Sequence, residues 1–483
     1  MPTAADHFIR KPFVISYVIF LMIFSALSRL ESFIQTPVHT TDENVYLRLA
    51  SQLKNNPFNY SPRSIAQELA QRGRNVFAYF NEPLFKHPPL FPYFLAAALK
   101  FSGNDLLAAY AVPLFFAVMV IPLVYLLGVA IFNQRTGLLA SVFVAIDPVQ
   151  IISSEKIWME TTLSFFTVLA AFLFVRALKT GRDFYFILSG IAGGLAALTK
   201  YPGILSIFIF IAYAFVYQQS LFRQKNFWVG LGTPFILLTP WFYWNYRVYG
   251  SGFGVQLLLT HEELFRNLSA DGLTKILLVI GWGCLILGAG IYFLLQKKVR
   301  LPKLFSTQKA ALPKLIFPCL GVIFLICIRK QFLHSFQFDY LPATGLSRQE
   351  FVTLEPALSS QLFYAGRLLE FSFVYVFAFL SFFLYSRWRQ EHEGLLRLSA
   401  LVILVFYILW GNYQSRYILA ATPFLCLLAA GFLGNILEWA AAVKTVPVRR
   451  MLNFLLFFFL IHIFIKAFVV NFYVSFPNVL CYF

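Results

Sequence analysis

The stretch LLAAYAVPLFFAVMVIPLVYLLGVAI, residues 106–131, contains no charged residue and is long enough to cross a lipid bilayer as a helix. Similar apolar runs recur near residues 12–30, 138–154, 160–178, 184–200, 202–218, 226–244, 273–295, 313–329, 368–386, 397–411, 417–438 and 451–470. Hydrophobic residues make up 59% of the chain and charged residues 12%, against about 25% in soluble proteins. The mean hydropathy is +0.71. These features predict an all-α polytopic membrane protein.

The chain is expected to form a single transmembrane domain over residues 1–483. No polar stretch is long enough for a separate soluble domain of roughly 100 residues. The first apolar segment, Phe13 to Leu30, exceeds the apolar part of a typical signal peptide, and no small-residue cleavage site follows it. We interpret it as a retained first span. The five cysteines lie mostly inside apolar runs without CxxC spacing, which indicates core residues rather than a disulfide framework or a zinc site.

The basic residues predict how the helices are oriented. The formal net charge is +18, and Lys and Arg recur in short clusters between the apolar runs. These clusters are Arg10-Lys11; Arg135; Lys179 and Arg182; Arg223 and Lys225; Lys297, Lys298, Arg300, Lys303 and Lys309; Arg387 and Arg389; Lys444, Arg449 and Arg450. Because basic loops stay on the inner side of a membrane, the charge reflects orientation rather than nucleic-acid binding. The pattern predicts about thirteen spans, with the amino end inside and the carboxyl end outside.

Two large loops are then expected on the outer side, at residues 31–105 and 330–367. Within the first, residues 88–101 form an apolar stretch that carries Lys100 and is too short for a standard span. A full crossing here would move every later basic cluster to the outer side. We therefore expect a helix that lies in the interface or re-enters from outside.

This orientation places a set of polar side chains on the outer face. They are Asp42, Glu43, Glu82, Lys86 and His87 in the first loop, then Glu155, Lys156, Glu160, Lys200, Arg416 and Tyr417 near the ends of later spans. A carboxylate can act as general base toward a hydroxyl, and isolated cations at a membrane surface suit an anionic headgroup. The combination suits a transfer reaction in which a lipid phosphate carries the donated group.

Most of these residues also have a structural interpretation. Asp42 and Glu43 suit the first turn of a helix that begins after Thr40 or Thr41, and Glu160 suits the start of a span. His87 before two prolines suits a turn. Lys200 and Arg416 would suit interfacial anchors, and Lys156 beside Glu155 suits an exposed ion pair.

Several motifs resemble those of the GT-C membrane glycosyltransferases, in the branch of the protein O-mannosyltransferases and the bacterial lipid A aminoarabinose transferases. They are Asp42-Glu43-x-x-Tyr46, His87-Pro88-Pro89-Leu90, Asn133-Gln134-Arg135-Thr136-Gly137, Trp158-Met159-Glu160, Gly190 to Lys200, and Ser415-Arg416-Tyr417 with Pro423. The resemblance is specific over about residues 40–205 and thinner afterwards.

The resemblance implies an inverting transferase that uses a polyprenyl-phosphate sugar. Asp42 would be the catalytic carboxylate with support from Glu43, and Lys200 would pair with Glu160 beside the donor phosphate. Arg416, Lys86 and Tyr417 would also bind that phosphate, and His87 and Glu82 would support the site.

Three positions depart from the family pattern. Glu160 stands where Asp is usual, Tyr110 stands where Arg is frequent, and Lys86-His87-Pro88 replaces the Glu-Lys-Pro of the aminoarabinose transferases. The last departure favours a hexosyl donor over a cationic sugar.

Two other functions remain as alternatives. An O-antigen polymerase or ligase would use arginines of the 330–367 loop, such as Arg348 and Arg367, and a lipid or glycan transporter would show repeat symmetry. The motif order favours the transferase. No cofactor is indicated, and a divalent metal is left open. The expected partners are the lipid-linked donor, a glycan, lipid or protein acceptor, and membrane lipids. The expected location is a bacterial inner or plasma membrane rather than the ER, with the active site facing outward.

Overall fold

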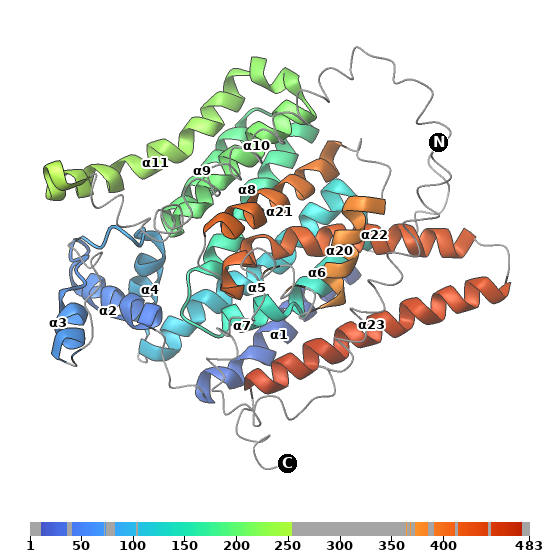
Figure 1. The fold of residues 1–483 in the computed structure, drawn as a ribbon, viewed down its shortest axis with the longest axis horizontal. Helices are drawn as coiled ribbons and strands as arrows, with labels where there is room; N and C mark the ends of the chain where they lie inside the picture. Colours follow the sequence, from blue (N-terminus) through green and yellow to red (C-terminus); the bar gives the residue numbers. More distant parts are fainter. Residues whose placement is uncertain are drawn as a thin grey trace.

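The structure, a computed structural model, describes residues 11–35, 41–71, 73, 83–102, 105–253, 364, 368, 372–384, 391–410, 414–442 and 446–475. The earlier elements are α1 (Lys11–Gln35), α2 (Thr41–Asn55), α3 (Arg63–Gln71), α4 (Leu90–Phe101), α5 (Asp105–Ile131), α6 (Gln134–Ala145), α7 (Pro148–Ser154), α8 (Glu160–Thr180), α9 (Phe184–Thr199), η1 (Tyr201–Ile204), α10 (Leu205–Val216), η2 (Gln219–Arg223), α11 (Lys225–Tyr249) and η3 (Gly250–Gly252). The later elements are α20 (Phe373–Leu384), α21 (Glu391–Trp410), η5 (Ser415–Ala420), α22 (Thr422–Ala442) and α23 (Val446–Ser475) (Figure 1). These described elements are all helical, which confirms the predicted fold class.

Three described helices are long and apolar enough to span a membrane by themselves. They cover Pro12–Arg29 in α1, Asp105–Ile131 in α5 and Glu160–Thr180 in α8. Several shorter apolar helices match predicted spans, including α9, α10, α20 and α22. The predicted spans near 273–295 and 313–329 lie outside the described residues, as does the predicted 330–367 loop apart from residue 364.

The span predicted near residues 138–154 forms two helices, α6 and α7, with a bend of 51° between them. Asp147 caps the start of α7, where its side chain accepts a hydrogen bond of 3.1 Å from the Gln150 backbone N–H. Pro148 follows as the first residue of α7. Proline disfavours helical backbone at the residue before it, and Asp is a good helix cap. The Asp-Pro pair therefore ends one helix and begins another.

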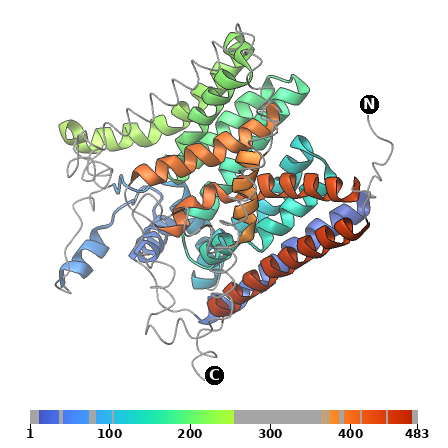
Figure 2. The same cartoon turned by 45° about the vertical axis from the view of Figure 1, so that its right-hand side comes forward.

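Small residues allow the helices to approach closely. A Cβ atom on Gly190 of α9 would lie 2.0 Å from the Gly230 carbonyl oxygen of α11, so only glycine fits this contact. Close backbone approach between small residues is typical of helix packing in membranes. Helices α1 and α23 lie side by side along one flank (Figure 2). They expose apolar side chains there, such as Phe20 and Phe457, which suit contact with lipid.

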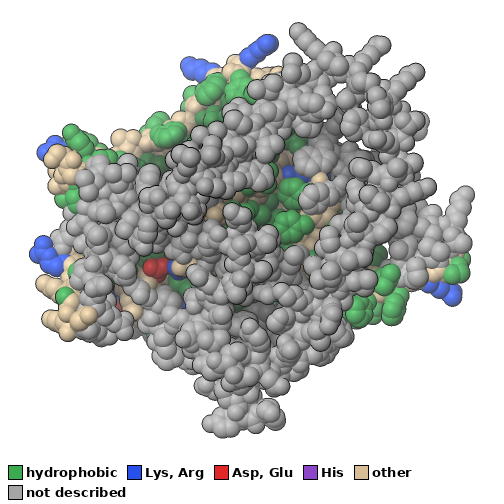
Figure 3. Space-filling view, viewed as in Figure 1, with side chains coloured by type: hydrophobic (Ala, Val, Ile, Leu, Met, Phe, Trp, Pro, Cys, Tyr) green, Lys and Arg blue, Asp and Glu red, His purple; other side chains and the backbone are tan. Residues whose placement is uncertain are grey.

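Helices α2, α3 and α4 form a small helical layer at one end of the bundle (Figure 1). Helix α4 packs on α2 and is only 12 residues long. Hydrogen bonds join the connecting loops: the Tyr60 hydroxyl donates to the His87 carbonyl at 2.9 Å, and Tyr93 donates to the Pro57 carbonyl at 2.6 Å. That residues 88–101 form a helix that does not cross the membrane stays a prediction. On the face shown in Figure 3, the visible Lys and Arg side chains lie mainly at the periphery.

The orientation of the bundle can be tested by labelling. Arg135, in the first turn of α6, and Arg182, between α8 and α9, are both exposed. We expect Arg135→Cys and Arg182→Cys to react with a membrane-impermeant maleimide only from the inner side, whereas Asn55→Cys at the end of α2 reacts from the outer side. Outer-side reaction of both arginine-site variants would contradict the predicted orientation.

Candidate active site

Four charged side chains from distant parts of the chain meet in one cluster. Asp42 lies in the first turn of α2, Glu160 begins α8, Lys200 follows α9, and Arg416 lies in η5. Arg416 Nη2 is 2.5 Å from Asp42 Oδ2, and Lys200 Nζ is 2.8 Å from Glu160 Oε1. A third contact, 3.7 Å between Arg416 Nε and Glu160 Oε1, links the two pairs. We call these four residues the charge cluster.

Asp42 is the most accessible carboxylate of the charge cluster. Its side chain is 31% exposed, whereas that of Glu160 is 3% exposed. Burial by itself raises the pKa of Asp42, but the charges of Arg416 and Lys200 and the hydrogen bond from Arg416 outweigh it and hold the pKa at about 2. Asp42 is therefore ionised at neutral pH and can accept a proton from a group that approaches its open side.

Arg416 is buried, and aromatic and polar groups fix its guanidinium. Its Cζ lies 4.4 Å from the ring centroid of Trp158, and its Nε donates to the Gln414 side-chain oxygen at 2.7 Å. Stacking on an aromatic face and several fixed hydrogen bonds suit Arg better than Lys. The structure therefore does not support the interpretation of Arg416 as a lipid-facing anchor.

A sharp turn between α9 and α10 positions Lys200. Pro202 lies at the start of η1, and a Cβ on Gly203 would lie 2.2 Å from the Ala196 carbonyl carbon, so this turn requires glycine. The Lys200 ammonium lies 4.2 Å from the ring centroid of Tyr417 and pairs with Glu160. The expected pairing of Lys200 with Glu160 is therefore present, and Tyr417 lies beside it.

Glu43 differs from its neighbour Asp42, because it is fully buried. Its Oε1 accepts a hydrogen bond of 3.0 Å from the backbone N–H of Ile157. This contact ties the first turn of α2 to the segment that leads into Trp158 and Glu160. Glu43 thus links the turn of α2 that carries Asp42 to the segment that carries Glu160.

Arg29 of α1 also anchors the segment that precedes α8. Arg29 of α1 is fully buried and donates to the Ser154 hydroxyl at 2.9 Å and to the Ala145 carbonyl at 3.1 Å. Glu155 and Lys156 are 1% and 6% exposed, so their interpretation as an exposed surface pair is wrong. Nothing in the local sequence distinguishes this buried pair from a solvated one. Arg29 was missed for the same reason, since an arginine near the end of a span normally reaches the interface.

His87 contacts Tyr46, which lies one turn after Asp42 in α2. Its Nδ1 is 3.4 Å from the Tyr46 hydroxyl, and the two rings meet edge to face. Burial is the main reason that the pKa of His87 falls to about 3, and Asp42 only partly opposes it, so His87 is neutral at neutral pH. Lys86 is half-buried beside it, Tyr110 is buried in α5, and Glu82 lies outside the described residues.

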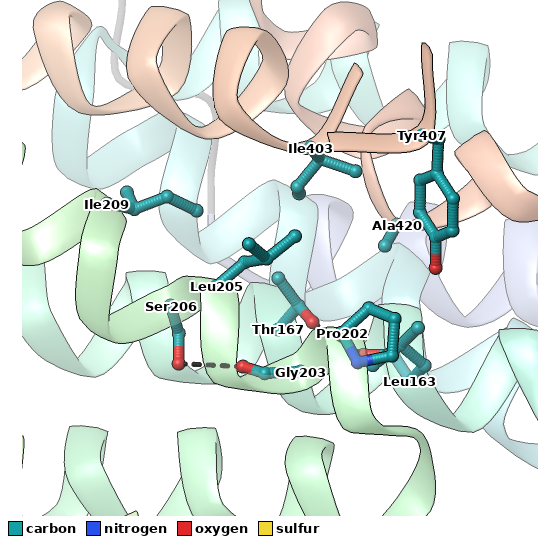
Figure 4. Close-up of a pocket in the computed structure, with 10 residues that line it drawn as sticks. All are labelled: Leu163, Thr167, Pro202, Gly203, Leu205, Ser206, Ile209, Ile403, Tyr407 and Ala420. Carbon is teal, nitrogen blue, oxygen red and sulfur yellow. Dashed lines mark hydrogen bonds between the residues drawn. The ribbon is translucent and has the colours of Figure 1, made fainter. Parts of the chain in front are cut away.

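A narrow apolar cavity lies next to the charge cluster, between α8, η1, α10, α21 and η5 (Figure 4). Its walls are Leu163, Thr167, Pro202, Gly203, Leu205, Ser206, Ile209, Ile403, Tyr407 and Ala420. Three of these follow shortly after cluster residues in sequence: Leu163 after Glu160, Pro202 after Lys200 and Ala420 after Arg416. The charged groups and the apolar cavity therefore adjoin, as a charged lipid would require. No group of three or more potential metal ligands occurs among the residues that the structure describes.

Comparison with known proteins identifies the fold. Residues 86–244 match the family described as dolichyl-phosphate-mannose-protein mannosyltransferase. The apo oligosaccharyltransferase of Archaeoglobus fulgidus matches with a TM-score of 0.57 and 18% identity, over 96% of this chain and 56% of that one. The same archaeal enzyme, AglB, with an inhibitory peptide and a dolichol-phosphate, matches with a TM-score of 0.54 and 16% identity over 96% and 56%.

A bacterial structure is similar over more of its own length. ArnT from Cupriavidus metallidurans bound to undecaprenyl phosphate matches with a TM-score of 0.50 and 11% identity, over 97% of this chain and 76% of that one. The chain spans about half the length of the archaeal structures. None of the curated proteins matches it. The chain therefore has the fold of the archaeal oligosaccharyltransferase and of ArnT, and its residues 86–244 match the mannosyltransferase family.

Proposed function

We propose that this chain is an inverting glycosyltransferase that moves a sugar from a polyprenyl-phosphate donor to an acceptor at the outer face of the membrane. The charge cluster carries the proposal, because it brings an accessible carboxylate together with two fixed cations at the ends of apolar helices. Dolichol-phosphate in the archaeal structure and undecaprenyl phosphate in ArnT are lipids of the required class. They support the donor class and leave the sugar open.

The proposed reaction is a single displacement. An acceptor hydroxyl hydrogen-bonds to Asp42, its oxygen attacks the anomeric carbon, and the bond between that carbon and the phosphate oxygen breaks. The hydroxyl proton passes to Asp42, and the bonding electrons leave with the lipid phosphate. Lys200 and Arg416 stabilise the charge that develops on the phosphate. Because one displacement occurs, the configuration at the anomeric carbon inverts.

In the structure, each cation of the charge cluster pairs with a carboxylate: Arg416 with Asp42, and Lys200 with Glu160. A donor phosphate would compete for both cations. When it binds Arg416, the contact between Arg416 and Asp42 weakens and the carboxylate becomes a better proton acceptor. This exchange would couple donor binding to activation of the acceptor hydroxyl.

A transfer assay tests the function. The purified protein in lipid nanodiscs would receive polyprenyl-phosphate sugars with glycan, lipid and protein acceptors, and the product anomer would be determined by NMR. We expect release of polyprenyl phosphate with inversion and no transfer from nucleotide sugars. Retention of configuration, or transfer from a nucleotide sugar, would contradict the proposal.

Lys200 provides a separate test of donor binding. We expect Lys200→Ala to weaken binding of undecaprenyl phosphate by roughly tenfold to a hundredfold, because a charge-assisted contact to phosphate is lost. Binding would be measured by native mass spectrometry or thermophoresis. The control is Lys54→Ala, which removes a lysine paired with Asp105 at 3.1 Å outside the charge cluster. Equal effects of the two variants would indicate a general surface-charge effect and contradict the site.

A further inference from the structure

The hydroxyl group of Tyr407 is a buried polar group that the proposed reaction does not use. Tyr407 lies in α21 and is 2% exposed. Its hydroxyl has no hydrogen-bond partner among the residues that the structure describes. Such a group lowers the stability of the folded protein, since its hydrogen bond to water is lost on folding without replacement. The Tyr407 hydroxyl is therefore a candidate to hydrogen-bond a bound molecule rather than another side chain.

The Tyr407 hydroxyl points into the apolar cavity beside the charge cluster. Figure 4 shows the tyrosine ring descending from α21, with its oxygen toward Pro202 and Leu163. The other walls are mostly aliphatic, and the hydroxyls of Thr167 and Ser206 donate to backbone carbonyls of their own segments, Leu163 at 2.8 Å and Gly203 at 3.0 Å. Tyr407 is thus the cavity residue whose polar atom is available to a ligand.

The ring of Tyr407 connects this cavity to the charge cluster. It stacks on the ring of Tyr417, with centroids 5.4 Å apart and planes 21° apart. The ammonium of Lys200 lies 4.2 Å from the centroid of Tyr417. An anion held by Lys200 and an apolar chain in the cavity would therefore meet close to the Tyr407 hydroxyl.

We propose that Tyr407 is a donor-binding residue whose hydroxyl donates a hydrogen bond to a phosphate oxygen next to the first isoprene unit of the lipid. The proposal rests on the proposed function, because it assumes a polyprenyl-phosphate ligand. The charge cluster binds the anion, the apolar side chains that line the cavity contact the start of the apolar chain, and the hydroxyl donates a hydrogen bond to an oxygen at the junction. Tyr407 would thereby set how deep the phosphate lies beneath Asp42.

Tyr407→Phe tests this role, because it removes one oxygen and keeps the ring stacked on Tyr417. We expect the affinity for undecaprenyl phosphate to fall by roughly tenfold, as expected for one hydrogen bond to a charged oxygen. The ligand-free protein should unfold at the same or a slightly higher temperature, because an unpaired buried group is removed. The control is Tyr213→Phe in α10, a buried tyrosine whose ring packs on Phe174. Its affinity for the lipid should equal that of the wild type.

The outcomes separate the two proposals. A wild-type protein that binds undecaprenyl phosphate and a Tyr407→Phe variant that binds it equally well would overturn the role of Tyr407 and leave the proposed function standing. Unchanged affinity together with a lower unfolding temperature would also overturn it, since the hydroxyl would then bind only a buried water. A wild-type protein that does not bind the lipid would contradict the proposed function itself.

Discussion

Asp42→Asn is expected to slow sugar transfer by roughly 100-fold or more, because the amide keeps the size of the side chain but cannot accept the acceptor's proton. The variant should still fold, since Asp42 is partly exposed and lies outside the apolar core. Its affinity for undecaprenyl phosphate should not decrease, because Arg416 loses its competing carboxylate. Transfer would be followed by release of polyprenyl phosphate, and donor affinity would be measured separately.

Glu43→Gln is the matched comparison, since it makes the same chemical change at the adjacent residue. The amide oxygen of Gln can still accept the hydrogen bond from Ile157, so we expect a clearly smaller loss of transfer than in Asp42→Asn. Near-normal transfer by Asp42→Asn together with an inactive Glu43→Gln would show that the two residues have the opposite roles.

The sequence was sufficient to predict the members of the charge cluster and, through the family resemblance, the pair of Lys200 and Glu160, but not the pair of Asp42 and Arg416. Acidic residues after the first span and isolated cations at later span ends indicated an anionic ligand on one face. The pair of Asp42 and Arg416 joins residues 374 positions apart, and no local pattern encodes such a contact. The burial of Glu43 was equally hidden, because adjacent residues in the first turn of a helix point in different directions.

The fold, too, could be predicted from the sequence only in part. Hydropathy located α5 and α8 close to their observed bounds, because a long apolar run with few charged residues is typical of a membrane-spanning helix. The break between α6 and α7 could have been predicted from the Asp147-Pro148 pair, which is typical of a helix start. We predicted one span because residues 138–154 are mostly apolar. The sequence did not indicate a role for Tyr407, because an aromatic residue in an apolar helix usually packs against its neighbours. Its significance arises only from the cavity around its hydroxyl.

Arg416 influences both the charge of the proposed phosphate site and the ionisation of Asp42. Burial is the largest influence on the Asp42 carboxyl and raises its pKa, and Arg416 is the main group that opposes it. With Arg416 present, Asp42 remains ionised down to about pH 2. Titration of Asp42 therefore imposes no acid limb on transfer by the wild type near neutral pH. Without the guanidinium, the pKa must rise, and a larger fraction of Asp42 is protonated at mildly acidic pH.

Arg416→Gln should therefore have two measurable effects. Transfer at neutral pH should fall by roughly 100-fold, because a cation that stabilises the leaving phosphate is lost. The remaining activity should also decline as the pH is lowered, with an acid limb of kcat/KM at higher pH than in the wild type. Arg416→Lys keeps the charge but loses the planar contact with Trp158, so it should be slower than the wild type while its acid limb stays close to the wild-type position. If Arg416→Gln and Arg416→Lys gave the same pH profile, the charge of Arg416 would not control Asp42, and the pairing seen in the structure would be only a packing contact.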